Sequence, residues 1–237
     1  MLETAMLRLE EAFFPSRCMG CGVLCRDPGV AFCWVCAQGL WPLQRPWCGQ
    51  CGRPLEGRPE DPRLCLGCVA RPPPYDRLQS AFFYGGPLAD AIIAFKHGGH
   101  AEYGARLGQM LLNAGEVRLP TVDLVVPVPL HPRRARQRGY NQARLLAKVV
   151  ARAANVPLRE MLRRVRDTGS QKGRTREERF AELAGSFRAT GSRRVEGRRI
   201  LLVDDVVTTG ATVQNCAAAL RSAGASEISV VSLARAR

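Results

Sequence analysis

Two adjacent carboxylates and a run of hydroxyl side chains form the stretch of this sequence that is best suited to chemistry. Asp204 and Asp205 follow the apolar run 200–203, and a Thr-Thr-Gly-Ala-Thr segment comes three residues later. Small residues before a helix leave backbone N–H groups and the positive end of the helix dipole free to bind a phosphate. The candidate phosphate-binding residues are Thr208, Thr209, Gly210, Ala211 and Thr212.

The two carboxylates would repel a bare phosphate, but they can bind neighbouring hydroxyls or a divalent cation. A ribose 5-phosphate therefore fits both halves of the stretch. An ordinary buried strand followed by a Thr N-cap is the alternative, but the length of the complete string favours ligand binding. The string is not a Walker loop, because no Gly-Lys-Ser/Thr follows it, and it is not a G-x-G-x-x-G dinucleotide fingerprint.

The positive charge of the chain is concentrated in one region. The net charge is +14, and the segment 131–199 contains 20 Lys and Arg against 6 Asp and Glu, so this segment carries the whole excess. A surplus of this size favours a polyanionic partner or substrate. A solvated face in an arginine-rich protein is the alternative.

The sequence gives no sign of a membrane protein. No run approaches the roughly 18 apolar residues of a membrane span. Residues 1–14 predict a short amphipathic helix and lack the basic-then-apolar order of a signal peptide. We therefore expect a cytoplasmic protein, in which the ten cysteines would not form disulfides.

Nine of the ten cysteines lie in residues 15–70, where four pairs have C-x-x-C spacing. This spacing lets two thiolates bind the same tetrahedral zinc ion, so two pairs complete one site. Sequential pairing, which gives two zinc ribbons, is the simplest arrangement; interleaved pairing and an iron–sulfur cluster are the alternatives. We expect two structural zinc ions, because so short a segment cannot bury enough apolar surface alone. The predicted ligands are Cys18, Cys21, Cys33, Cys36, Cys48, Cys51, Cys65 and Cys68.

A second kind of sequence follows a proline-rich linker at 71–77. Apolar patterns predict strands over 78–84, 123–129, 200–203 and 228–233, and helices over 88–95, 103–114 and 143–154. This order predicts a three-layer α/β domain with a mostly parallel sheet over 78–237. Ligands of such domains bind beyond the carboxyl ends of the strands, where the acidic pair falls.

Two further segments could contact the ligand. Residues 131–142 predict a loop with four arginines that could clamp a charged phosphate group, although a solvated basic loop is the alternative. The candidates for pyrophosphate or DNA phosphate are Lys96, Arg133, Arg136 and Arg138. Residues 162–187 are polar between two short strand-like ends and predict a mobile flap or hairpin that carries Gln171, Lys172 and Arg179.

The phosphate loop resembles the phosphoribosyl pyrophosphate (PRPP) loop of type I phosphoribosyltransferases, in which the acidic pair contacts the ribose hydroxyls and the Thr-rich loop binds the 5-phosphate. The whole pattern is similar to the ComF/ComFC family of competence proteins. The matching motifs are the multi-cysteine module, Phe-Lys-x-Gly at 95–98, Arg-x-Arg-Gly-Tyr-Asn-Gln at 136–142, the flap motif and the phosphate loop. The flap departs from the family at two positions, Arg174 and Glu182.

The family resemblance implies three hypotheses. The first, which we favour, is a DNA-uptake protein that binds single-stranded DNA through its basic surface and PRPP with magnesium through the phosphate loop. The second is an enzyme that transfers ribose 5-phosphate from PRPP to an unknown acceptor, with the arginines of 131–142 and magnesium stabilising the departing pyrophosphate. The third is an adaptor whose zinc ribbons dock a DNA-import helicase or a recombination protein.

Overall fold

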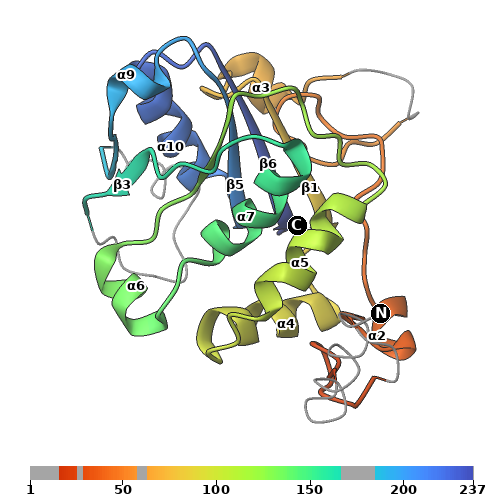
Figure 1. The fold of residues 1–237 in the computed structure, drawn as a ribbon. Helices are drawn as coiled ribbons and strands as arrows, with labels where there is room; N and C mark the ends of the chain where they lie inside the picture. The colour runs from red at the N-terminus through yellow and green to blue at the C-terminus, as the bar shows by residue number, and fades with distance from the viewer. Residues whose placement is uncertain (1–15, 26–28, 58–62, 167–184, 237) are drawn as a thin grey trace.

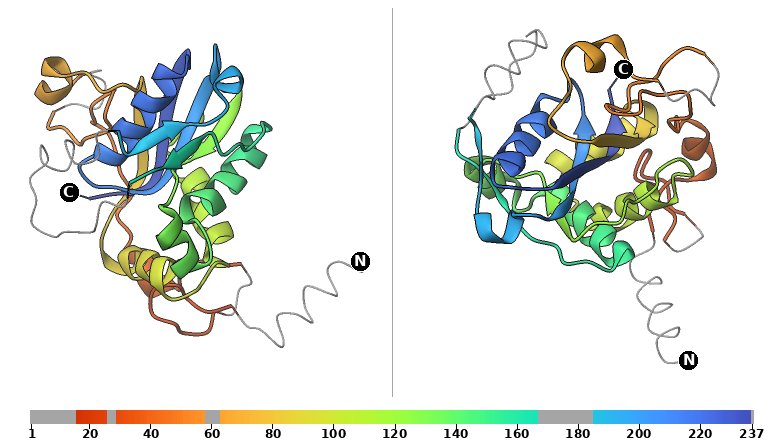
Figure 2. Two further views of the ribbon diagram at one scale, coloured as in Figure 1. Left: turned by 90° about the vertical axis from the view of Figure 1, so that its left-hand side faces the viewer. Right: turned by 90° about the horizontal axis from the view of Figure 1, so that it is seen from above.

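The computed structural model describes residues 16–25, 29–57, 63–166 and 185–236. The predicted N-terminal helix at 1–14 and the flap residues Gln171, Lys172 and Arg179 lie outside these ranges. A central sheet is covered by helices on both faces, and the cysteine-rich segment lies along one side (Figures 1 and 2).

Four parallel strands form the central sheet in the order β1-β6-β5-β2. They span Arg77–Phe83 (β1), Leu124–Pro127 (β2), Arg199–Val207 (β5) and Glu227–Arg235 (β6). The central strands β5 and β6 are buried along most of their length, as expected of parallel strands covered on both faces. This architecture confirms the predicted α/β class with a mostly parallel sheet.

Different helices cover the two faces of the sheet. One face packs against α4 (Gly86–His97), α5 (Tyr103–Asn113) and α7 (Gln142–Ala154). The other face packs against α10 (Ala211–Ser222), α9 (Ser192–Val195) and a two-stranded antiparallel ribbon of β3 (Leu162–Arg164) and β4 (Phe187–Ala189). The two strands of this ribbon lie at the two ends of the segment 162–187, where the sequence predicted short strand-like ends.

Strand β5 is longer than predicted. The apolar run 200–203 marks only its first half, and the strand continues through Asp204 and Asp205 to Val207. It continues because β6 pairs with it over the same length, with Asp204 opposite Ser232 and Val207 opposite Arg235. The acidic pair therefore lies inside a strand and is held by the sheet itself, rather than by a loop.

The cysteine-rich segment covers the open edge of the sheet at β1. Residues 41–43 run antiparallel to the end of this strand. The N–H of Leu43 donates to the carbonyl of Ala81 at 2.9 Å, and the N–H of Phe83 donates to the carbonyl of Trp41 at 2.8 Å. An edge strand that is paired in this way cannot recruit a strand from another chain.

The second half of the cysteine-rich segment contacts the start of β1 and the side chain of Arg235, the last residue of β6. The N–H of Leu78 donates to the carbonyl of Gln50 at 2.7 Å, and Nη1 of Arg235 donates to the carbonyl of Cys51 at 2.8 Å. Gly52 has a φ of +66°, and a Cβ there would lie 2.5 Å from the carbonyl oxygen of Leu78. Only glycine permits this close approach of two backbones.

The two short helices of the cysteine-rich segment begin at the same place relative to a C-x-x-C pair. Helix α2 (Trp34–Gln38) and helix α3 (Leu66–Ala70) each begin directly after a cysteine, and each contains the next cysteine of the same C-x-x-C pair. The two segments therefore have similar local structure although their sequences differ.

Candidate functional site

A cavity of about 710 Å³ lies beyond the carboxyl ends of β2 and β5. The chain leaves these two neighbouring strands towards helices on opposite faces of the sheet, and such a switch point is where α/β sheets bind ligands. The lining includes Lys96, His97, Arg134, Arg138, Arg164, Asp204, Asp205 and Thr212. Charged side chains that are far apart in the sequence thus face one space.

Asp204 and Asp205 form the floor of this cavity, and both are buried. Successive residues of a strand point to opposite faces, so Asp204 faces the side of α10 and Asp205 faces the side of α4. Burial, together with the charge of Asp205, raises the pKa of Asp204 to about 8. Oδ1 of Asp204 accepts the N–H of Asp205 at 2.9 Å, which fixes the orientation of its carboxyl group.

Asp205 already has two partners. Its Oδ2 lies 3.0 Å from Nζ of Lys96, and its Oδ1 accepts the N–H of Val206 at 2.6 Å. Lys96 lies near the end of α4, and its side chain is 26% exposed, against 11% for Asp205. The lysine therefore neutralises a nearly buried carboxylate at the base of the cavity.

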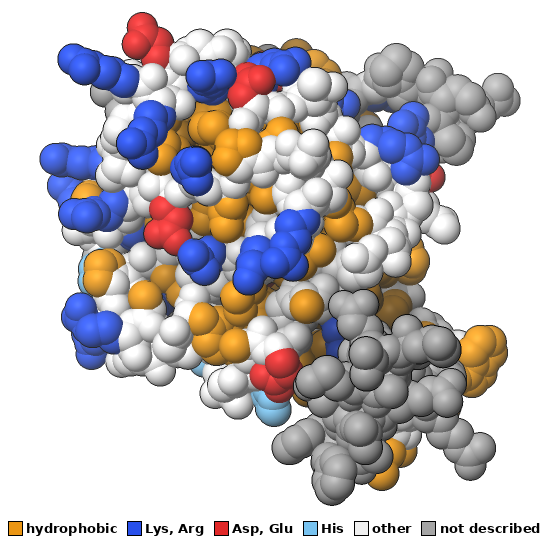
Figure 3. Space-filling view, in the orientation of Figure 1, with side chains coloured by type: hydrophobic (Ala, Val, Ile, Leu, Met, Phe, Trp, Pro, Cys, Tyr) orange, Lys and Arg blue, Asp and Glu red, His pale blue; other side chains and the backbone are white. Residues whose placement is uncertain are grey.

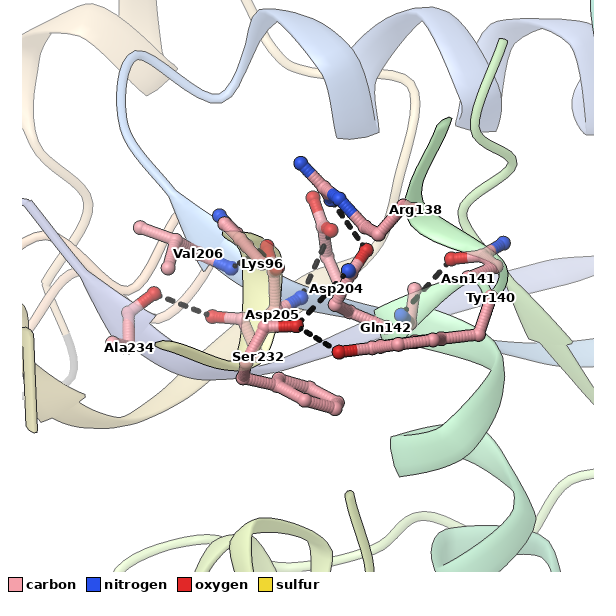
Figure 4. A network of polar contacts seen from close by, with 12 residues as sticks. Lys96, Arg138, Tyr140, Asn141, Gln142, Asp204, Asp205, Val206, Ser232 and Ala234 are labelled. Atoms are coloured by element: carbon pink, nitrogen blue, oxygen red, sulfur yellow. Dashed lines mark hydrogen bonds and ion pairs between the residues drawn. The ribbon is translucent and has the colours of Figure 1, made fainter. Parts of the chain in front are cut away.

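A network of polar contacts fixes the backbone next to Lys96 (Figure 4). The carbonyl of its neighbour Phe95 accepts the hydroxyl of Tyr140 at 2.6 Å and Nε2 of Gln142 at 3.3 Å. Oε1 of Gln142 accepts Nη1 of Arg138 at 2.6 Å. The end of α4 is therefore fastened to the start of α7 and to an arginine of the cavity wall.

The predicted phosphate loop joins β5 to α10. Gly210 adopts a left-handed conformation with a φ of +82°, and α10 begins at the next residue, Ala211. The N–H of Ala211 lies 3.4 Å from Oγ1 of Thr209. Thr208 is exposed, whereas Thr212 lies in the first turn of α10 and lines the cavity. The loop thus directs the N-terminus of a 12-residue helix towards the cavity.

The arginine-rich segment contains a helix where we predicted a loop. Helix α6 spans Pro132–Arg138 and ends at Gly139, which has a φ of +80°. Proline in the first turn and a left-handed glycine after the last turn are ordinary signals for the ends of a helix, and they were present in the sequence.

The arginines of this helix lie on two different sides of it. Arg134 and Arg138 are half-buried and line the cavity, and burial lowers the pKa of Arg138. Arg133 and Arg136 are exposed and do not line it. Among the predicted phosphate candidates, the structure therefore brings Lys96 and Arg138 to the acidic pair, and it adds Arg134.

Arg164 on β3 is a further cavity residue that we did not predict. Its guanidinium lies 5.5 Å from the ring centroid of Phe187 on β4, a distance at which an arginine interacts with the face of a ring. In the sequence it is the second of two adjacent arginines, Arg163 and Arg164, and nothing in the pattern gave a reason to prefer one over the other. Only the side of the ribbon on which it lies distinguishes it.

Eight of the ten cysteines form two groups of four. The groups are Cys18, Cys21, Cys33 and Cys36, and Cys48, Cys51, Cys65 and Cys68; within each group the sulfur atoms lie within 4.8 Å of one another. This arrangement confirms the sequential pairing and is not the interleaved one.

The geometry of each group fits a tetrahedral zinc ion. Cys21 and Cys33 have sulfur atoms 3.7 Å apart, as do Cys51 and Cys65. Zn–S bonds of about 2.3 Å in a tetrahedron place neighbouring sulfurs about 3.8 Å apart. Cys48 Sγ also accepts the N–H groups of Cys51 and Cys65, which stabilises a thiolate.

Comparison with known proteins agrees with both parts of the chain. The model of the phosphoribosyl transferase domain matches residues 141–237, and the model of the double zinc ribbon domain matches residues 9–73. The fold and the two kinds of site therefore define a type I phosphoribosyltransferase-like domain that is preceded by a double zinc ribbon. No helix within the described ranges is long and apolar enough to cross a membrane.

Relatives that match over most of their length identify the family. "Competence protein F" of Haemophilus influenzae is 32% identical, over 94% of this chain and 99% of its own. "DNA utilization protein YhgH" of Escherichia coli K12 is 32% identical, over 88% and 97%. "Competence protein ComFC" of Bacillus subtilis is 31% identical, over 88% and 85%. The chain belongs to this family of competence protein F, ComFC and YhgH.

Proposed function

We propose that this protein acts in the cytoplasm in the uptake and use of DNA, and that it binds PRPP in the cavity and single-stranded DNA on its basic surface. One observation carries the PRPP part. A buried acidic pair, the N-terminus of α10 and two arginines of α6 face a single cavity of about 710 Å³. This volume falls within the range of sites for small ligands.

Each part of PRPP has a matching group. In the proposed complex Asp204 and Asp205 bind the ribose hydroxyls, and the N-terminus of α10 with Thr212 binds the 5-phosphate; all of these groups border the cavity. Arg134 and Arg138, which line the cavity, would bind the pyrophosphate, because arginine binds phosphate through paired N–H donors.

The acidic pair also limits how magnesium could be held. Both oxygens of Asp205 are engaged, by Lys96 and by the N–H of Val206. The pair therefore fits hydroxyl recognition and a cation that arrives on the phosphates of PRPP, rather than a cage of protein carboxylates. Magnesium carried in this way would neutralise part of the charge of the pyrophosphate.

The DNA part is supported by the charge and by the relatives. The chain has a net charge of +14, and its relatives carry the names of competence and DNA utilization proteins. A basic surface binds nucleic acid in a salt-dependent way. Free thiols arranged as zinc ligands support a reducing compartment.

Calorimetric titration with PRPP and magnesium tests the cavity. We expect saturable binding to the wild-type protein and at least tenfold weaker binding to Asp204→Asn/Asp205→Asn. The matched control is Asp90→Asn, an exposed acidic residue of α4 that does not line the cavity. Equal affinity of the double variant and the wild type would show that the acidic pair does not hold PRPP.

An active phosphoribosyltransferase is the second candidate function, because the phosphoribosyl transferase domain model matches residues 141–237. Transfer would break the bond between C1 of the ribose and the pyrophosphate, release the pyrophosphate and form a new bond from C1 to the acceptor. Release of pyrophosphate from PRPP, measured with cell-derived small molecules and with DNA as acceptors, tests this reaction. Tight PRPP binding without any release under these conditions would favour the binding function.

A further inference from the structure

Two arginines face each other across the β3–β4 ribbon. Arg163 and Arg188 are direct partners in the antiparallel register, and both are exposed. Direct partners in a ladder point to the same side of the ribbon. Arg164 and Phe187, the next pair, lie on the other side, where Phe187 is buried and Arg164 lines the cavity.

Like charges placed directly opposite each other in a ladder destabilise it. Among the described residues, no ion pair joins Arg163 or Arg188 to an aspartate or a glutamate. Val165, two residues beyond Arg163, is 42% exposed and continues the same side by the alternation of a strand. Within the described residues, the outer side of the ribbon therefore carries two exposed arginines and an exposed apolar side chain.

The elements around the ribbon extend this surface. Helix α6, strands β3 and β4 and helix α9 together contain nine arginines and no aspartate or glutamate. Arg133 and Arg136 of α6 and Arg193 and Arg194 of α9 are exposed. Lys and Arg side chains gather along the left-hand edge in Figure 3, where Figure 1 places α9, β3 and α6.

The same elements form one wall of the cavity. Arg134 and Arg138 of α6 and Arg164 of β3 face inwards, whereas Arg133, Arg136 and Arg163 face outwards. One helix and one strand thus separate two sets of arginines. The inner set faces the proposed ligand of the cavity, so the outer set is available to bind a different anion.

We propose that the outer sides of α6, β3–β4 and α9 bind the phosphates of single-stranded nucleic acid. Guanidinium groups bind phosphates and can also stack on exposed bases, and the bases of a single strand can reach Val165, whereas those of a duplex are paired and stacked. The inference rests on the proposed function and assigns its DNA-binding part to one surface.

Binding of a fluorescent oligo(dT) to the full chain at two or more salt concentrations tests the assignment. The variant Arg163→Gln/Arg188→Gln should bind at least tenfold more weakly at low salt. Its slope of log affinity against log salt should fall by about 1.4, which is the value for two single-strand phosphates. The matched control is Lys148→Gln/Arg152→Gln on α7, which removes the same charge from the other face of the sheet and should change affinity less than threefold.

Two further readouts separate the causes of any change. Arg163→Gln/Arg188→Gln should unfold at the same or a higher temperature than the wild type, because a like-charge pair is removed, and it should bind PRPP with unchanged affinity. If this variant keeps the wild-type affinity for oligo(dT), or if the α7 control loses as much affinity as the variant, the surface assignment alone is overturned. No binding by the wild type at low salt would overturn the DNA part of the proposed function itself. Equal binding of duplex DNA would overturn the assignment to single strands.

Discussion

Nζ of Lys96 lies 3.0 Å from Oδ2 of Asp205, so α4 and β5 are joined by an ion pair at the base of the cavity. The contacts of Phe95 with Tyr140 and Gln142 hold the backbone next to the lysine, and the ion pair holds its ammonium group. Its charge is therefore in place before any ligand arrives, and the ligand does not have to order it.

Lys96→Met is expected to weaken PRPP binding by about tenfold or more. Without the ammonium group, the carboxylate of Asp205 would repel the phosphates of the ligand in a partly buried site, where charges are poorly screened. Titration calorimetry measures the affinity, and Lys96→Arg, which keeps the charge, should retain more binding than Lys96→Met. Unchanged affinity in Lys96→Met would show that the ion pair has no role in recognition.

The raised pKa of Asp204, about 8, predicts a stability that falls as the pH rises. The native carboxyl keeps its proton above the pKa that it has in the unfolded chain, so the unfolded state binds fewer protons between about pH 4 and 8. The loss is at most about 1.4 kcal/mol per pH unit for one group.

Urea unfolding at pH 6 and pH 8 measures this loss, and Asp204→Asn removes the titrating group. The difference between the two pH values should be smaller in the variant than in the wild type. An equal difference in both proteins would assign the pH dependence to other groups.

The purified protein should contain two zinc ions per chain. Removing them should destabilise the central sheet as well as the two groups of four cysteines. The reason is that backbone groups near the zinc ligands, such as the carbonyls of Gln50 and Cys51, bond directly to β1 and β6. Metal analysis gives the stoichiometry, and thermal unfolding with and without a strong chelator gives the loss.

Cys48→Ser should lower the unfolding temperature in the same way, because Cys48 is buried in the second group of four. Cys25→Ser is the matched control, since Cys25 belongs to neither group. A sheet that unfolds at the same temperature without zinc would contradict the coupling.

Gly108→Ala is expected to destabilise the protein by about 1–3 kcal/mol, the usual cost of overpacking. Helices α5 and α7 pack so closely that a Cβ at Gly108 would lie 2.7 Å from the side chain of Val149. Denaturant unfolding measures the change. Gly115→Ala, where no atom lies within 4 Å of the added Cβ, should have little effect, and Gly108→Ala/Val149→Ala should show whether the clash is the cause.

Local spacing was sufficient to identify the eight cysteines that form the two groups and to identify the acidic pair. C-x-x-C pairs and an apolar run followed directly by Asp-Asp are patterns of neighbouring residues, so no tertiary contact was needed to find them. Which C-x-x-C pairs share one site could be decided only from the structure, because spacing alone allowed two arrangements.

The side of an element on which a residue lies could not be predicted in the same way. Arg133 and Arg134 are neighbours in sequence, and only the rotation of α6 places Arg134 at the cavity. Arg164 lines the cavity because β4, which is remote in the sequence, pairs with β3 and sets the ribbon against the sheet. The extension of β5 through the acidic pair likewise depends on β6.

The cover that the cysteine-rich segment provides for β1 has a consequence for synthesis on the ribosome. Residues 41–52 leave the ribosome before β1, whereas β6, the other neighbour of this strand, is made last. The hydroxyls of Ser80 and Ser232, which meet at 2.7 Å, are 152 residues apart in the chain. Residues 41–52 cover only the edge of β1 that faces away from β6, so the edge that pairs with β6 stays open on the nascent chain until Glu227–Arg235 has been made.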